Sequence, residues 1–250
     1  MKTVIVIPAR LESTRLPRKL LLDRTGKTLI EHTFESALES QMADQVVVAT
    51  DSQEIATVIS DAGGTAILTS PDHQSGTDRI AEAIASIDAE IVINVQGDEP
   101  EIDGKSIDLL VEILQINAQC SIATLATPLK TVDQYLDPAC VKVVVDLSGK
   151  ALYFSRNPVP ASRDPSKLEM WMQSSPNAFL QHIGIYAYRR DCLLKFASLQ
   201  TTALENIESL EQLRLLENGW SILVGIVDHH ATGIDTPEDY DQFVNRWTNR

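Results

Sequence analysis

The sequence is poor in basic residues, in cysteine and in aromatic residues. Its 250 residues include 21 Lys and Arg against 35 Asp and Glu, for a net charge of −14, and aromatic residues make up only 5%. This excess of acid argues against general nucleic-acid binding, which needs an extended basic face. The three cysteines, Cys120, Cys140 and Cys192, are odd in number and widely spaced. They favour reduced thiols over a disulfide framework or a zinc cluster.

Long apolar runs and the common nucleotide-binding motifs are also missing. The apolar run near the start ends at Pro8, which is too short for a signal peptide or a membrane span and predicts a cytoplasmic protein without membrane insertion. Neither G-x-G-x-x-G nor G-x-x-x-x-G-K-[ST] occurs, so a dinucleotide-dependent dehydrogenase and a P-loop phosphotransferase are poorly supported. His229 and His230 are adjacent, which favours a loop pair over metal ligands.

A short basic segment stands out against this acidic background. The apolar residues 4–7 run directly into residues 8–19, which contain four basic side chains between Arg10 and Lys19 and one acidic residue, Glu12. A turn that follows a strand and carries small, hydroxyl and basic residues offers N–H groups and fixed charges to a polyphosphate. The alternative is an exposed loop whose charges are only solvated.

The first half of the chain alternates apolar strands with amphipathic helices. Strands are predicted at residues 4–7, 46–49, 65–68 and 91–95, and helical patterns separate them. The predicted helices begin at the capping patterns Thr28-x-x-Glu31 and Asp51-x-x-Glu54. Continuous apolar strands alternating with helices predict an α/β fold with a Rossmann-like, mostly parallel sheet covered on both faces.

The pattern changes after residue 120. Residues 141–146 and 151–155 flank a Ser-Gly turn and predict a β-hairpin. Residues 157–177 are rich in Pro, Ser and charge and are interpreted as a long loop over an active site, or else as a flexible surface segment. Helical patterns at 193–199 and 207–216 and a strand at 222–227 follow. We predict a single domain over residues 1–250, with an insertion at about residues 120–190.

Polar residues follow the predicted strands, at the edge where open parallel sheets bind ligands. Asp98 follows a glycine at the end of a buried strand, where an acid is well placed to hold Mg²⁺ against a phosphate oxygen. Asp235 precedes Thr236-Pro237 and is a second candidate. Asp98 could instead be an ordinary turn residue, and Thr236 a simple helix N-cap.

The motifs along the chain resemble those of the 3-deoxy-manno-octulosonate cytidylyltransferases. The resemblance covers nearly the whole chain in order, and rests on residues 8–10, 13–19, 73–79, 94–100, 151–156, 182–186, 210–214 and 235–239. The opening loop is shared by many sugar nucleotidyltransferases, whereas the combination of Ser-Gly-Thr, Tyr-Phe-Ser-Arg and Glu-Gln-Leu-Arg is specific to this family. The resemblance implies a fold of the nucleotide-diphospho-sugar transferase type.

The resemblance also implies a reaction and its residues. In that reaction the anomeric hydroxyl of 3-deoxy-D-manno-octulosonate (Kdo) attacks the α-phosphorus of CTP with Mg²⁺ as cofactor. The implied catalytic residues are Arg10 and Lys19 on the triphosphate and Asp98 and Asp235 on the metal. The implied nucleotide side comprises Pro8, Ala9, Arg10, Ser13, Thr14, Arg15, Lys19, Ser75, Gly76, Thr77 and Arg79. The implied sugar side comprises Gln96, Arg156, His182, Tyr186, Glu211 and Gln212.

One position departs from the family pattern, and alternatives to the Kdo reaction stay open. The family usually has glycine before the lysine of the first loop, whereas this chain has Arg18; if that position needs a positive φ, the arginine costs roughly 1 kcal/mol. The same chemistry on another acid sugar (an amino-substituted Kdo or a sialic acid) and a CTP-sensing module without turnover are the alternatives. The resemblance further suggests a homodimer built on the hairpin-bearing region.

Overall fold

The computed structural model describes residues 1–228 and 233–249, so His229 and His230 lie outside the described residues. The chain forms two compact units. Unit 1 comprises Met1–Val111, Arg189–Ala197 and Ala231–Arg250, and unit 2 comprises Glu112–Tyr188 and Ser198–His230. Unit 2 thus contains most of the predicted insertion together with a later segment of the chain.

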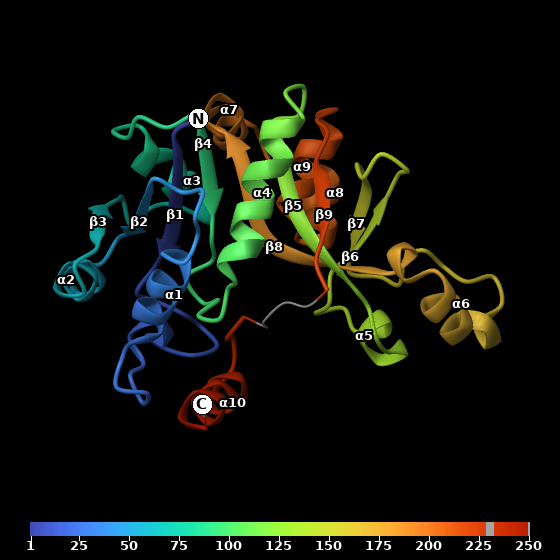
Figure 1. The fold of residues 1–250 in the computed structure, drawn as a ribbon, viewed down its shortest axis with the longest axis horizontal. Helices are drawn as coiled ribbons and strands as arrows, with labels where there is room; N and C mark the ends of the chain where they lie inside the picture. Colours follow the sequence, from blue (N-terminus) through green and yellow to red (C-terminus); the bar gives the residue numbers. More distant parts are fainter. Residues whose placement is uncertain (229–232, 250) are drawn as a thin grey trace. The chain divides into compact units, whose positions relative to one another are not determined.

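Unit 1 is built on a parallel sheet whose strands lie in the order β3, β2, β1, β4 (Figure 1). The strands are β1 (Thr3–Ala9), β2 (Gln45–Thr50), β3 (Thr65–Leu68) and β4 (Ile91–Asn94). Strands β1 and β4 are buried along their whole length, which is the burial that their continuous apolar runs predict. The predicted strands of this half of the chain are therefore confirmed.

Helices cover this sheet. Unit 1 contains η1 (Lys19–Leu21), α1 (Leu29–Ala37), α2 (Gln53–Asp61), α3 (Gly76–Ile84), most of α7 (Arg190–Ser198) and α10 (Pro237–Thr248), while α4 (Gly104–Ile116) runs from unit 1 into unit 2. Helices α1 and α2 pack against each other, and α3 packs on β1 and β2. The chain moves across the sheet one way from β1 to β3 and then back past β1 to β4. Because the crossovers are right-handed, α3 lies on the face of the sheet opposite to α1 and α2.

The capping patterns correctly predict one helix start and misplace another. Thr28 and Glu31 form the predicted capping box of α1. Helix α2 instead takes Ser52 as its N-cap, because the Ser52 side chain accepts from the N–H of Ile55. The carboxylate of Asp51 is engaged elsewhere and caps nothing. A carboxylate one residue before a serine leaves two candidate caps, and local sequence alone does not choose between them.

Unit 2 contains a mixed sheet. Its strands are β5 (Ile122–Pro128), β6 (Lys142–Val145), β7 (Ala151–Ser155), β8 (Leu180–Arg189, of which Arg189 belongs to unit 1) and β9 (Leu223–Ile226). Strand β5 pairs antiparallel with β8 and parallel with β9. Strands β6 and β7 form the predicted antiparallel hairpin, and β6 also pairs with β8. The sequence analysis did not identify β5 and β8.

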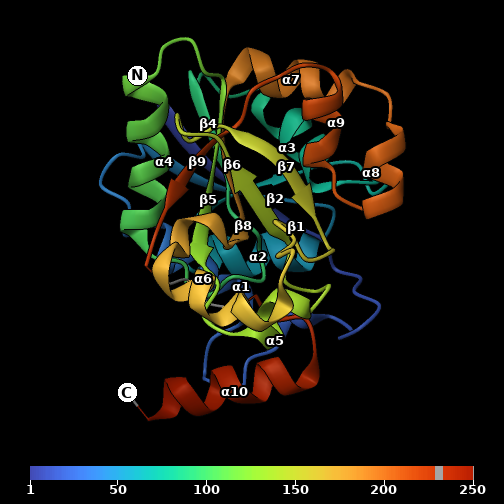
Figure 2. The same cartoon turned by 90° about the vertical axis from the view of Figure 1, so that its right-hand side faces the viewer.

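The interpretation of residues 157–177 as one long loop is wrong in part. This segment contains η2 (Pro165–Lys167), α6 (Leu168–Ser174) and the start of η3 (Pro176–Ala178). Leu168 and Met172 of α6 lie four residues apart and are buried in a cluster with Tyr135 of α5 (Val132–Leu136) and Phe179. Figures 1 and 2 show α5 and α6 side by side in unit 2. The apolar pair forms a helix only because this cluster covers it.

The helix predicted at residues 207–216 is in fact two helices, α8 (Ala203–Glu208) and α9 (Gln212–Glu217). They lie beside each other in unit 2 (Figure 2). Ser209 between them adopts a left-handed conformation with φ of 52°, which ends a right-handed helix. The three cysteines are free thiols, as predicted. Within the described residues, none of the helices is both long enough and apolar enough to cross a membrane.

Candidate active site

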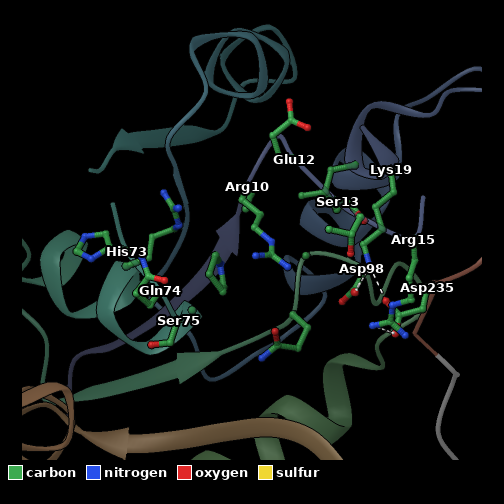
Figure 3. Close-up of a pocket in the computed structure, with 18 residues that line it drawn as sticks. Arg10, Glu12, Ser13, Arg15, Lys19, His73, Gln74, Ser75, Asp98 and Asp235 are labelled. Atoms are coloured by element: carbon green, nitrogen blue, oxygen red, sulfur yellow. Dashed lines mark hydrogen bonds and ion pairs between the residues drawn. The ribbon is translucent and has the colours of Figure 1, made fainter. Parts of the chain in front are cut away.

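Unit 1 has a cavity of about 360 Å³ beyond the carboxyl ends of β1 and β4 (Figure 3). It is lined by Pro8, Ala9, Arg10, Glu12, Ser13, Thr14, Arg15, Lys19, Leu20, His73, Gln74, Ser75, Gly76, Arg79, Gln96, Gly97, Asp98 and Asp235. The predicted segments from four separate parts of the sequence therefore meet at one edge of the sheet, where an open parallel sheet places its ligands. Of the residues predicted for the nucleotide side, Thr77 alone does not line the cavity, and it is buried within α3.

The basic loop supplies cations to one wall of this cavity. Arg10 follows β1 directly and is exposed, and its guanidinium points into the cavity between Ser75 and Asp98 (Figure 3). Arg15 forms an ion pair with Asp235 at 3.1 Å. Cationic side chains at the end of a strand favour an anionic ligand and attract it from solution.

Lys19 is the point at which the site converges. Its Nζ donates to Asp98 Oδ2 at 2.5 Å, to Asp235 Oδ1 at 2.8 Å and to the carbonyl oxygen of Ile234 at 2.9 Å. The Lys19 side chain is only 12% exposed. Two carboxylates that stand far apart in the sequence are thus held around the ammonium of Lys19, whereas the sequence analysis expected them to meet at Mg²⁺.

The backbone explains how Asp98 and Asp235 meet. The N–H of Ile234 donates to the carbonyl oxygen of Asp98 at 2.9 Å, which places the two segments side by side. Gly97 lets Asp98 approach β1, because a Cβ at this glycine would lie 3.0 Å from the carbonyl oxygen of Pro8. Such a contact is too close for any larger residue without a shift of the backbone.

The start of α10 fixes Asp235. Thr236 is the N-cap, with Pro237 at the first helical position, and the Asp239 carboxylate accepts from the N–H groups of Asp235 and Thr236 at 3.1 and 2.9 Å. Burial raises the pKa of Asp239, but the bonds from the Thr236 hydroxyl and from these two N–H groups, with the charge of Lys19, together lower it. Thr236 is therefore the predicted helix cap, and in that place it also orients the neighbouring Asp235.

Arg18, which stands where the family usually has glycine, has the positive φ that favours glycine. Its φ is 53° and its ψ is 31°, in the left-handed region, where a non-glycine residue costs of order 1 kcal/mol. The Arg18 side chain forms an ion pair with Glu54 of α2. Leu20, two residues later, is buried. These contacts hold the loop on either side of Lys19 in place despite the strain.

Ser75, Arg79 and Gln96 occupy the remaining walls. Ser75 is the N-cap of α3, and its hydroxyl accepts from the N–H of Asp78 at 3.1 Å. Gln96 donates to Asn94 at 3.3 Å. Arg79 is 4% exposed, and its guanidinium is engaged by Asp51 and Thr69 at 2.8 and 2.6 Å. Arg79 thus lines the cavity while its donors are used within the protein.

The other predicted sugar-side residues lie in unit 2. The Thr124 hydroxyl lies 3.0 Å from His182 Nε2, and the rings of His182 and Tyr186 are 5.4 Å apart. Burial raises the pKa of Tyr186 well above its ordinary value, and the negative charge of Glu211 adds to this effect. Gln212 is buried, whereas Glu211 is half-buried. Four of the predicted sugar-side residues therefore come from two elements, β8 and the start of α9.

Arg156 of unit 2 is bound to the main chain. Its guanidinium donates to the carbonyl oxygens of Glu208 at 2.8 Å, Pro138 at 3.2 Å and Ser209 at 3.3 Å. The Arg156 carbonyl accepts from the buried Lys142 at 2.6 Å. These bonds connect the end of β7 to the end of α8.

Two residues beside the cavity received no role in the site from the sequence analysis, namely Asp51 and Glu99. The sequence predicts a helix start at Asp51, but in the structure its carboxylate accepts from the N–H of Leu11 in the basic loop and from the guanidinium of Arg79. Glu99 is buried beside Asp98; burial raises its pKa to about 8, and the negative charge of Asp98 contributes. The signal for Glu99 was its place directly after Gly97-Asp98 at the end of a fully buried strand.

The donor set at Asp98 and Asp235 suits a hard cation. Within residues 1–228 and 233–249, no cluster of three or more His, Cys, Asp or Glu side chains is arranged to hold a metal ion. Two carboxylates and one carbonyl oxygen nevertheless surround the ammonium of Lys19. Mg²⁺ is commonly bound by one or two carboxylates together with substrate phosphates and water, so these residues fit it.

Comparisons with known proteins agree on one family. Residues 4–222 match the family model described as Cytidylyltransferase. The 3-deoxy-manno-octulosonate cytidylyltransferase of Rhodopirellula baltica is 49% identical over 247 residues, with 98% of each chain covered. That of Geotalea uraniireducens is 43% identical over 253 residues, covering 98% of this chain and 99% of the relative.

Solved structures extend the comparison to the fold. A CMP:2-keto-3-deoxy-manno-octonic acid synthetase complexed with CTP is 40% identical, with a TM-score of 0.92 over 100% of this chain and 99% of that chain. A 4-diphosphocytidyl-2C-methyl-D-erythritol synthase from Anaerococcus prevotii is 12% identical, with a TM-score of 0.63 over 100% and 99% of the two chains, and shows the fold alone.

Proposed function

The chain belongs to the 3-deoxy-manno-octulosonate cytidylyltransferase family, and from this premise we propose that it transfers CMP from CTP to Kdo, releasing pyrophosphate. The product, CMP-Kdo, is the activated sugar for lipopolysaccharide biosynthesis. The observation that carries the proposal is the cavity of unit 1, in which the basic loop after β1 faces two carboxylates from distant parts of the chain. A triphosphate and a cation are the ligands that such a cavity suits.

The reaction requires charge control around one phosphorus atom. The anomeric hydroxyl of Kdo attacks the α-phosphorus of CTP and releases its proton to water, the bond from this phosphorus to the bridging oxygen breaks, and pyrophosphate leaves with that electron pair. Positive charge fixed around the phosphates stabilises the transition state, provided that the attacking and leaving oxygens are in line. Arg10 and Lys19 supply this charge on our proposal, and Arg15 assists them from the same loop.

Asp98 and Asp235 would hold Mg²⁺, which when bound lowers the pKa of the attacking hydroxyl and neutralises phosphate charge. Their support is the convergence of both carboxylates and the Ile234 carbonyl on one cation. The proposal assigns to the protein itself the orientation of these ligands, through Gly97 on one side and the cap of α10 on the other.

The nucleotide side of the site is formed on this proposal by residues 8–15 and by the start of α3. The proposed sugar side comprises Gln96 in unit 1 and Arg156, His182, Tyr186, Glu211 and Gln212 in unit 2. Between the last two, the half-buried Glu211 is the better placed to meet a ligand, because Gln212 is buried. The contacts of Arg156 with main-chain carbonyls support a role in shaping this region.

We further propose a homodimer formed through the hairpin-bearing region and a cytoplasmic location. The free thiols of the three cysteines are those of a reducing compartment. Light scattering on the purified protein at several concentrations measures the mass in solution, and a monomer of 27.6 kDa throughout would contradict the dimer.

A substrate panel tests the function. Pyrophosphate release is measured with four nucleoside triphosphates, each against Kdo, an amino-substituted Kdo and a sialic acid, with Mg²⁺ present. We expect release with CTP and Kdo and little release with the other pairs. Turnover of another acid sugar in preference to Kdo would identify that sugar as the substrate. CTP binding without any turnover would indicate a sensing module.

A further inference from the structure

Asp51 connects the basic loop (residues 8–19) to the rest of unit 1. It follows β2 directly, and its side chain is 17% exposed. One carboxylate oxygen, Oδ1, accepts from the N–H of Leu11 at 3.2 Å, and the other, Oδ2, accepts from the guanidinium of Arg79 at 2.8 Å. The Leu11 N–H belongs to the peptide bond that joins Arg10 to Leu11. Asp51 thus holds the main chain at the residue proposed to bind the triphosphate.

Arg79 extends this connection to two more elements. Its side chain is only 5% exposed, and it donates through a second nitrogen to the Thr69 hydroxyl at 2.6 Å and to the Ser70 carbonyl at 3.5 Å. Thr69 follows β3, and Arg79 itself lies in the second turn of α3. The Arg79 guanidinium therefore joins the carboxyl ends of β2 and β3 to the helix whose first turn lines the cavity.

The energetics favour a fixed arrangement. A nearly buried ion pair that is also hydrogen-bonded to its surroundings is rigid, and removal of one partner leaves the other charge buried and unpaired. A loop held in its binding conformation before the ligand arrives does not have to be ordered on binding. The position of Asp51, outside the cavity lining and bonded to the loop, is that of a residue acting through others.

We propose that Asp51 is a positioning residue for the nucleotide. It fixes the peptide between Arg10 and Leu11 and holds Arg79, so that Arg79 acts by organising the cavity wall and contacts no phosphate. The inference rests on the proposed function for its substrate, and it gives a role to a residue that the sequence analysis placed at the end of a strand and at a helix start without one.

The first test is Asp51→Asn. The asparagine keeps the shape and an oxygen acceptor for the Leu11 N–H, but it removes the charge that holds Arg79. We expect the KM for CTP and the Kd of CTP measured by calorimetry to rise about 10-fold, while the KM for Kdo stays within twofold. Hydrogen exchange of the peptide that contains Leu11 should become faster in the free protein.

Asp44→Asn is the matched control. Asp44 also accepts from a main-chain N–H, that of Thr3 at 2.7 Å, but Thr3 is the first residue of β1 and lies at the opposite end of the strand from the cavity. We expect this variant to leave both KM values and the exchange of the Leu11 peptide unchanged. A loss of stability common to both variants is thereby separated from an effect on the nucleotide.

Arg79→Lys and the double variant test the assignment of Arg79. Lysine keeps the charge but has one nitrogen in place of the two that reach Asp51 and Thr69 separately. If both residues act as one unit, the double variant should raise the Kd of CTP no more than the stronger single variant. Thr69→Val, which removes only one acceptor of Arg79, should give a smaller rise of a few-fold and provides a milder change if Asp51→Asn folds poorly.

Three outcomes would overturn the inference. The first is a Kd for CTP and a Leu11 exchange rate in Asp51→Asn equal to those of the wild type. The second is an equal rise in the KM values for CTP and Kdo together with a lower Tm, which indicates a purely structural role. The third is a multiplicative effect of Asp51→Asn and Arg79→Lys. A wild-type protein that binds CTP without turnover would contradict the proposed function only, because binding and exchange still test Asp51.

Discussion

At the residue scale, Lys19 has the strongest consequences. Lys19→Met should lower kcat/KM about 100-fold, because removal of a preorganised charge from a transition state costs roughly 3 kcal/mol. The same variant should bind Mn²⁺ more tightly than the wild type in the absence of CTP, since Asp98 and Asp235 lose the ammonium between them. Steady-state kinetics and electron paramagnetic resonance of free Mn²⁺ measure the two effects.

Arg15→Gln is the control for Lys19, because Arg15 also pairs with Asp235 but is far more exposed. It should change Mn²⁺ affinity less than Lys19→Met does. Near-normal kcat/KM in Lys19→Met would refute the assignment of this residue to the phosphates.

Arg18 provides a test of backbone strain. Its φ of 53° suits glycine, so Arg18→Gly should be more stable than Arg18→Ala by about 1 kcal/mol. Both variants lose the exposed ion pair with Glu54, which contributes little and cancels in the comparison. Urea unfolding of the two variants measures the difference, and equal stabilities would show that the loop relaxes to a negative φ.

Glu99 predicts a pH dependence of stability. Its folded pKa of about 8 lies above the ordinary value of 4.5, so the folded state holds a proton that the unfolded chain releases. The stability associated with this group is therefore present at low pH and is lost as the pH rises toward 8, by at most roughly 1.4 kcal/mol per pH unit. Glu99→Gln should remove this loss. Urea unfolding at pH 5.5 and pH 8 is the measurement, and parallel behaviour of both proteins would contradict it.

At the scale of elements, the metal site depends on the end of β4 and the start of α10. Asp98→Asn and Asp235→Asn should each lower kcat by orders of magnitude with the fold intact, because asparagine keeps an oxygen ligand but loses the charge. The double variant should be little worse than either single variant, since parts of one unit are not additive. Circular dichroism monitors the fold and single-turnover kinetics measure the rates.

Strictly multiplicative losses in the double variant would mean that Asp98 and Asp235 act at separate places.

Thr236→Ala is the control for α10. It removes the N-cap, for a cost of about 1 kcal/mol in stability, and leaves both carboxylates present.

At the scale of the whole molecule, CTP should stabilise the protein from the cavity of unit 1. Ligand at 100 times its Kd adds about 2.7 kcal/mol to the free energy of unfolding. Protection from hydrogen exchange on CTP binding should concentrate in residues 8–20, 73–79 and 94–98, which carry the lining residues. Mass spectrometry of exchanged peptides measures this protection. Protection confined to unit 2 would contradict a nucleotide site in the cavity of unit 1.

The sequence predicts much of the fold through patterns that are local. Continuous apolar runs identify β1, β2 and β4, because a strand buried on both faces requires them. The capping box at Thr28 is equally local, and so is the Ser-Gly turn between β6 and β7, where Gly149 has a φ of 80°. Residues 157–177 escaped because a short amphipathic helix is stable only against its partners, and the sequence does not show that Tyr135 and Phe179 cover Leu168 and Met172.

The sequence by itself determines which residue types are available to the site, because a basic loop in an acidic chain and an aspartate after a buried strand can be read without a structure. The tertiary structure decides which of them meet. The hydrogen bond between Ile234 and Asp98, together with the cap of α10, brings Asp235 to Lys19. The fold alone shows that Asp51 bonds Leu11 and Arg79 and does not form the cap of α2 that its place in the sequence predicted. Such contacts join residues distant in sequence, and their energies depend on burial, which no local pattern encodes.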